Sequence, residues 1–213
     1  MNRVIRLTLP AALIAVATLS STAHAQRPGP GRPTAGILGG VTFPIGDFKD
    51  EVGTGWHAGG LIKMRAYGAL DIRLDGAYTK FGKKDILGTA ATVSTDGNMS
   101  FGTLNALINL GPDSAAYPED KTNSPYLLAG VGRYRLDYKA TCAELEAGGI
   151  SCQNFVPPTI KTYTGLNIGA GVTVPILGGV RSFVEFRYHR ISRPLEEGGA
   201  RGMFLLSAGV KIR

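Results

Sequence analysis

A repeated alternation of apolar and polar residues is the feature that most constrains this chain. Between Ala35 and Arg213 it recurs in eight stretches, each of the roughly ten residues that a membrane-spanning strand needs. Successive residues of a strand point to opposite faces, so each stretch predicts a strand with one apolar and one polar face. The predicted strands are Gly36–Pro44, Gly55–Arg65, Leu70–Phe81, Asn98–Leu110, Tyr126–Lys139, Thr162–Pro175, Ser182–Ile191 and Met203–Arg213.

The charges on the second face decide which side of the sheet meets lipid. In the third stretch Asp71, Arg73 and Asp75 share one face, and Ile72 and Leu74 share the other. A Lys or Arg at the midplane of a lipid-facing wall costs about 2–4 kcal/mol, so the charged face is expected inside. The pattern predicts an all-β fold, an eight-stranded antiparallel up-and-down transmembrane β-barrel. Because eight strands leave a lumen that side chains just fill, we expect a polar, packed interior and no open pore.

The same reasoning predicts an ionic cluster in the barrel interior. Its members are the charged residues on the polar parity of four strands, and they include both signs. The predicted cluster consists of Lys63, Arg65, Asp71, Arg73, Asp75, Arg133, Arg135, Asp137, Glu185 and Arg187.

The first 25 residues have the pattern of a cleavable export signal. Arg3 and Arg6 precede an apolar core at Leu7–Leu19, and a small-x-small site predicts cleavage between Ala25 and Gln26. The predicted organisation is therefore a signal peptide at 1–25, a Pro/Gly-rich leader at 26–34 and one barrel domain at 35–213.

Charge and connection lengths limit partners and orientation. Cleavage at the predicted site removes two arginines and no acids, which leaves 21 basic and 16 acidic residues without a run of like charge, so no nucleic-acid partner is expected. The odd-numbered connections include the longest ones. Outer loops are longer than periplasmic turns in outer-membrane barrels, so both termini are predicted to be periplasmic. The connection Gly111–Pro125 is long for a turn and is placed in the periplasm by parity alone.

Cys142 and Cys152 are the only two cysteines, and both fall in the longest predicted outer loop. In an exported protein an even, close pair indicates a structural disulfide. Closing a loop of about ten residues would stabilise it by roughly 2–3 kcal/mol in the chain-entropy model. A metal site would need more ligands than two sulfurs. The sequence indicates no metal, cofactor or catalytic site.

The opening segment GILGGVTFPIGDF and the closing segment FLLSAGVKIR, around alternating strands, resemble bacterial outer-membrane β-barrel-domain proteins of the OmpA/OmpX type. The resemblance covers Ala35–Arg213. It implies a place in the outer membrane in contact with lipid and lipopolysaccharide, and assembly by the barrel-assembly machinery. Members of that family usually end on an aromatic residue, which the machinery reads, whereas this chain ends on Arg213.

Three functions follow as hypotheses. The first is a structural or surface-interaction protein whose outer loops contact an unidentified extracellular ligand; it has no catalytic residues. The second is an enzyme similar to lipid A deacylases, which carry a His-x-Ser pair on one face of a strand. Here the spacing of His189 and Ser192 is His-x-x-Ser, which points the two side chains to opposite faces. The third is a soluble lipocalin-like carrier, which would need apolar residues inside and thus conflicts with the inward charges. We expect the first.

Overall fold

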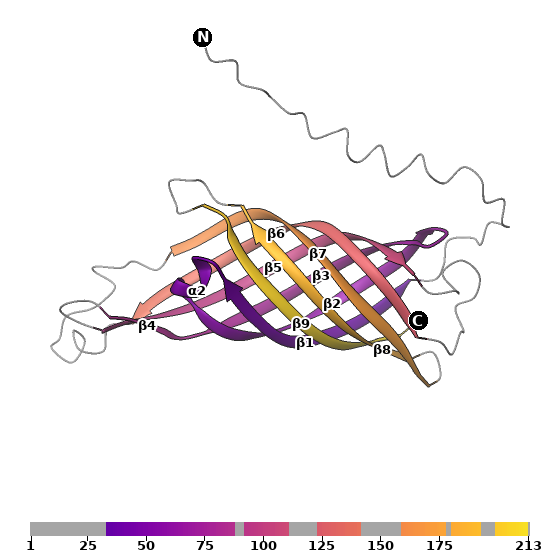
Figure 1. Cartoon of the computed structure of the whole chain (residues 1–213), viewed down its shortest axis with the longest axis horizontal. Helices are drawn as coiled ribbons and strands as arrows, with labels where there is room; N and C mark the ends of the chain where they lie inside the picture. The colour runs from indigo at the N-terminus through magenta and orange to yellow at the C-terminus, as the bar shows by residue number, and fades with distance from the viewer. Residues whose placement is uncertain are drawn as a thin grey trace, which may run out of the picture.

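Nine strands form one antiparallel sheet that closes on itself (Figure 1). The structure, a computed structural model, describes residues 33–87, 92–110, 123–141, 159–177, 180–192 and 199–212. Its elements are β1 Thr34–Ile45, α2 Phe48–Glu51, β2 Gly53–Tyr67, β3 Leu70–Gly82, β4 Lys84–Leu87, β5 Thr92–Asn109, β6 Ser124–Thr141, β7 Thr159–Leu177, β8 Val180–Ile191 and β9 Arg201–Ile212. Within these ranges, no helix has the length and hydropathy to cross a membrane.

Closure of the sheet depends on two pairings. β9 pairs with β1, and β3 pairs with β5 from Leu70↔Ile108 to Lys80↔Asn98. The short β4 continues the line of β3 beyond Lys83 and pairs with the next part of β5. The wall therefore has eight strands, each antiparallel to its neighbours. The predicted fold class, an antiparallel eight-stranded barrel, is confirmed.

The two ends of the barrel differ. The terminal end carries the first residue of β1, the last residue of β9 and the tight turn Gly68–Ala69, where Gly68 has a φ of 52°. The loop end carries α2 and β4, on the opposite side of the molecule (Figure 1). β5 and β6 pair as far as Ser94↔Thr141, beyond their predicted starts and ends. The alternation missed this extension because residues beyond the lipid band need no apolar face.

Several predicted features lie outside the described residues. These are the signal peptide and its cleavage site, most of the leader, both cysteines and the terminal Arg213. The signal peptide and the disulfide therefore stay predictions.

The outward wall of the barrel is apolar over most of its height. Most large side chains on this wall are more than a third exposed, and Ile37 and Ile168 reach 67% and 62%. A water-soluble monomer rarely exposes a continuous apolar surface of this extent. Other members of the band are Trp56, Ile62, Leu74, Leu104, Val131, Leu166, Val184, Phe186, Leu206 and Ile212.

The two faces of β6 are the reverse of those predicted. Its interior side carries Tyr134 and Leu136, which are at most 1% exposed. Arg133 and Arg135 are exposed on the opposite, outward side, and Asp137 shares their parity. The assignment of these three charged residues to the interior ionic cluster is therefore wrong.

The physical reason is that β6 carries apolar residues on both parities near the terminal end. Leu127 and Val131 are exposed on the outward wall, while Leu128 is buried inside. The charges of β6 lie past this outward apolar segment, closer to the loop end, where the cost of an arginine falls to about 0–1 kcal/mol near the interface. Charge alone therefore could not assign the faces of this strand.

Candidate functional site: barrel interior and basic rim

Two arginines and two carboxylates form the centre of the interior. Arg73 on β3 donates from Nη1 and Nη2 to the two carboxylate oxygens of Glu185 on β8, at 2.7 and 2.9 Å. Its Nε donates to Asp75 at 3.0 Å. Arg187 donates from Nε to Glu185 at 3.0 Å, and the Tyr126 hydroxyl donates to the same carboxylate at 2.9 Å. The four charged residues are at most 3% exposed, and we call them the central network.

Further polar side chains surround the central network. Asn105 Nδ2 donates to Asp75 at 2.6 Å and to the Thr103 hydroxyl at 3.0 Å. Lys211 Nζ donates to the Thr173 hydroxyl at 2.8 Å. Because buried charge is tolerated only when it is paired and hydrogen-bonded, these contacts make the network a structural crosslink between opposite sides of the barrel.

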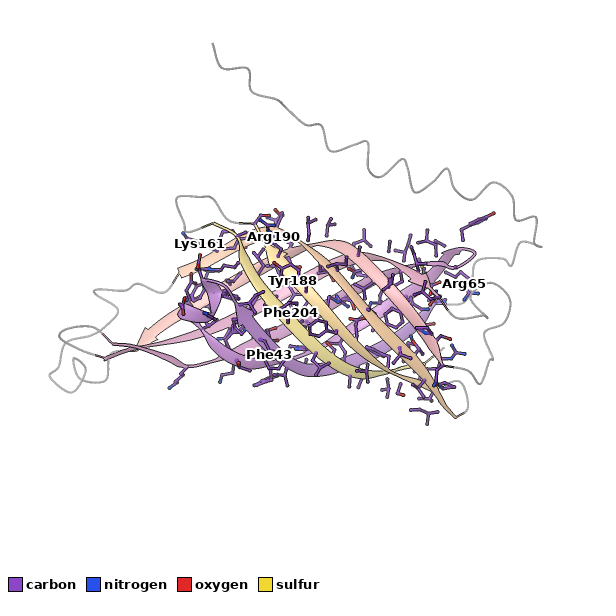
Figure 2. The ribbon with its side chains drawn as sticks, viewed as in Figure 1. Phe43, Arg65, Lys161, Tyr188, Arg190 and Phe204 are labelled. Atoms are coloured by element: carbon purple, nitrogen blue, oxygen red, sulfur yellow. The ribbon has the colours of Figure 1, made fainter. Side chains whose placement is uncertain are left out.

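A second ionic cluster lies at the terminal end. Asp71 forms ion pairs with Lys63 and with Arg65, the latter at 3.6 Å. Asn109 Nδ2 donates to Asp71 and to the Ala69 carbonyl, both at 3.0 Å. Figure 2 shows Arg65 at this end of the barrel. Of the ten residues predicted for the interior ionic cluster, the structure thus places seven inside, in two groups, and the three on β6 outside.

An apolar cluster fills most of the loop-end part of the interior, beside the buried polar side chains of Thr79 and His189. The residue that closes it is Phe48 on α2, which is fully buried and packs edge-on against Phe81 with ring centroids 5.2 Å apart. We call this buried cluster the loop-end plug. It consists of Phe48, Val52, Phe81, Met99, Phe101, Tyr134, Leu136, Tyr163, Ile191, Met203 and Leu205.

Arg201, at the start of β9, holds α2 over the plug. It forms an ion pair with Glu51 of α2, and its Nη1 donates to the Tyr138 hydroxyl at 2.7 Å. The guanidinium also lies 5.4 Å from the centre of the Phe48 ring. Sequence reasoning missed this contact, because Glu51 and Arg201 lie in connections 150 residues apart with no pattern that joins them.

The interior histidines are occupied by structural hydrogen bonds. His57 bonds through Nδ1 to the Thr42 hydroxyl at 3.0 Å and through Nε2 to the Ser207 hydroxyl at 2.8 Å. His189 is buried, and its Nδ1 bonds to the Tyr134 hydroxyl at 2.8 Å.

His189 and Ser192 are not arranged as a base and a nucleophile. Ser192 is exposed on the outward parity of β8 while His189 points inward, so the wall separates the two side chains. A catalytic pair needs hydrogen-bond contact. Across the described ranges, no group of three or more His, Cys, Asp or Glu could hold a metal ion.

Charged side chains reach the outward wall only near the loop end, within the residues described. On β3 and β8 the basic residue is the next outward position after Tyr78 and Tyr188, and such aromatic residues mark membrane interfaces in barrels. Figure 2 shows Arg190 and Tyr188 in this region. We call these basic residues the basic rim. It consists of Lys80, Arg133, Arg135 and Arg190, and Asp137 is the acidic residue beside it.

No protein-family model matches the chain, and no curated protein sequence matches it. The solved structures with a similar fold include the following three. Neisserial surface protein A has a TM-score of 0.57 and 16% identity, over 87% of this chain and 99% of that chain. The N-terminal β-barrel domain of Pseudomonas aeruginosa OprF has a TM-score of 0.50 and 14% identity, over 84% and 96%. A major outer membrane protein from Thermus thermophilus has a TM-score of 0.50 and 13% identity, over 86% and 100%.

These similarities agree with the geometry described above. The wall is closed, its outward face is apolar, and its charged side chains are inside or at one rim. The chain has the fold of the eight-stranded transmembrane outer-membrane β-barrels of the OmpA/OmpX type.

Proposed function

We propose that this protein is a bacterial outer-membrane barrel with a structural and surface-interaction role. In this proposal the barrel is closed to solutes, the loop end faces the cell exterior, both termini are periplasmic, and the outer connections contact an extracellular ligand. The role is not catalytic. Export through the signal peptide and assembly by the barrel-assembly machinery belong to the same proposal.

The observation that carries the proposal is the filled interior. The central network joins β3 to β8 through Arg73 and Glu185, and the loop-end plug fills the half above it. An ion crossing the lumen would have to break buried ion pairs and then pass an apolar cluster. A scaffold role fits such an interior better than a transport role.

The proposed orientation rests on the ends of the barrel. The terminal end has the tight turn Gly68–Ala69, and the loop end has α2 and the hairpin extended by β4. Outer connections are the longer ones in barrels of this architecture. The name of one similar structure, Neisserial surface protein A, also agrees with display at a cell surface.

An epitope-insertion experiment tests the orientation. One variant carries a short epitope between Gly199 and Ala200 at the loop end, and its matched control carries it between Gly68 and Ala69 at the terminal end. We expect antibody to label intact cells only for the first variant, and both variants after permeabilisation. Labelling of the Gly68–Ala69 variant on intact cells would reverse the orientation, and recovery of the protein in the soluble periplasm would reject the proposal.

Conductance tests the closed interior. The purified wild-type barrel, added to planar bilayers, is expected to give no stepped current. The comparison is the double variant Arg73→Ala, Glu185→Ala, which removes the main crosslink of the interior. Regular, long-lived steps from the wild-type protein would contradict a scaffold role.

Lipid A mass spectra of cells with wild-type protein, His189→Ala or Ser192→Ala are expected to be identical, because the two residues face opposite sides of the wall.

A further inference from the structure

The apolar surface of the outward wall is hollowed where four neighbouring strands meet. The hollow is an open groove of about 730 Å³ across β3, β5, β6 and β7, and its apolar lining comes from Leu74, Leu104, Val131 and Leu166. This volume lies within the roughly 300–1,000 Å³ typical of ligand sites. Because the groove opens on the lipid-facing wall, an acyl chain is the ligand part that fits it.

Gly102 lines the groove and contributes no side chain to it. A Cβ at this position would have no atom closer than the Asp75 carbonyl oxygen, at 3.8 Å, and Gly102 is not in a positive-φ conformation. The backbone would therefore accept other residues. Local packing does not require glycine here, and a leucine at this position would project into the groove.

Polar groups line the loop-end side of the same groove. Arg133, Thr164 and Ser192 are among its lining residues, and Arg133 pairs in register with Thr164. Arg135 is the next outward residue of β6, and Arg190 lies across from Leu166 on β8. Among the residues that the structure describes, the side chains of these three arginines have no hydrogen-bond or ion-pair partner.

Guanidinium groups without a partner among the described residues, placed above an acyl-sized groove, are complementary to a phosphorylated lipid, since Arg binds phosphate through two parallel hydrogen bonds. Arg133 and Arg190 are two strands apart, which separates their backbones by roughly 10 Å. One phosphate on a phospholipid does not span that separation, whereas lipid A carries two phosphates and several acyl chains.

We propose that this face binds lipopolysaccharide, with lipid A phosphates on Arg133, Arg135 and Arg190 and an acyl chain in the groove at Gly102. This inference rests on the proposed function and adds a defined lipid site to the outward wall. Lipopolysaccharide lies in the outer leaflet, so the groove and its arginines meet it only when the loop end faces the cell exterior.

Native mass spectrometry of the purified full barrel in detergent tests the site. The probe is a deep-rough lipopolysaccharide with two lipid A phosphates, and phosphatidylglycerol and monophosphoryl lipid A are the comparison lipids. The wild-type protein is expected to retain the bisphosphorylated probe in preference to both. Arg133→Gln with Arg135→Gln, and separately Gly102→Leu, should each weaken binding by about tenfold or more, as loss of a charge-assisted contact or of the groove predicts.

Two matched variants separate this site from general effects. Lys80→Gln removes another basic-rim charge outside the groove, and Ala208→Leu enlarges an outward side chain on β9, away from the groove; both should bind as the wild type does. Heat-dependent gel mobility checks that each variant is folded. If Gly102→Leu does not fold, the arginine variant alone tests the inference. Unchanged binding by the folded variants, or equal retention of phosphatidylglycerol by the wild type, would overturn the inference. Because this assay uses the purified barrel, its result is independent of the epitope test of cellular orientation.

Discussion

Arg73 joins two carboxylates at the centre of the interior. It contacts carboxylates on its own strand and on β8, and all of them are buried. A buried carboxylate without its cation is strongly unfavourable, whereas an exposed arginine near the interface is inexpensive to replace. Two arginines of the same chain should therefore respond very differently to the same substitution.

Arg73→Leu should lower the free energy of unfolding by about 3–5 kcal/mol, because it leaves Glu185 and Asp75 with less compensation. Arg135→Leu, on the outward side of β6, should change it by no more than about 0.5 kcal/mol. Urea unfolding in phosphatidylcholine vesicles, followed by the fluorescence of the single tryptophan Trp56, measures both. Equal losses for the two variants would place Arg135 inside the barrel.

At the scale of the element, β6 and α2 determine what the interior contains. β6 turns Tyr134 and Leu136 inward. Its inward-facing glycines leave room for side chains of the adjacent strand. A Cβ at Gly132 would lie 2.6 Å from Thr103 Cγ2, and one at Gly130 would overlap the Asn105 side chain. α2 closes the same end by placing Phe48 in the plug.

Gly130→Ala should therefore destabilise the barrel by about 1–3 kcal/mol through overpacking. Its matched control is Gly102→Ala, where the added Cβ points outward without a close contact and should leave stability unchanged. The measurement is the same urea midpoint in vesicles. A neutral Gly130→Ala together with a destabilising Gly102→Ala would mean that the two faces are reversed.

Phe48→Ala should cost about 3 kcal/mol, as expected for truncation of a fully buried aromatic side chain. Asp47→Ala makes a suitable control, because Asp47 caps α2 without a side-chain hydrogen bond and is exposed. Thermal unfolding of the detergent-solubilised barrel compares the two. If both variants melted with the wild type, α2 would not contribute to closing the interior.

At the scale of the whole molecule, the distribution of polarity is that of a protein surrounded by lipid. Apolar side chains cover the outward wall, charges are paired inside, and within the described residues the basic rim is at the loop end alone. This asymmetry gives the barrel two different ends as well as two different faces.

Ile168, near the middle of β7 and 62% exposed, tests the lipid-facing wall directly. Ile168→Arg should lower the stability of the vesicle-inserted barrel by about 2–4 kcal/mol, the cost of a cation in the hydrocarbon midplane. In a water-soluble barrel the same exposed substitution would change stability by only about 0.5 kcal/mol. The fraction of heat-modifiable, vesicle-inserted protein at increasing urea reports the difference.

Much of the fold could be predicted because lipid imposes a strict rule on each strand. Asp71, Arg73 and Asp75 alternate with apolar residues, so β3 keeps these charges out of hydrocarbon only when they face the interior. The same rule predicted the inward faces of Glu185 and Arg187. It failed on β6 because Leu127 and Leu128 are both apolar, so either face could have met lipid.

The sequence by itself determined the number of barrel strands and most of their faces, because alternation is a local property that each strand carries alone. Only the tertiary structure decided which residues meet. The pair Arg73–Glu185 spans 112 residues and the pair Arg201–Glu51 spans 150. The loop-end plug and the groove at Gly102 likewise depend on strand register and closure, since side chains from several strands come together only when the sheet closes.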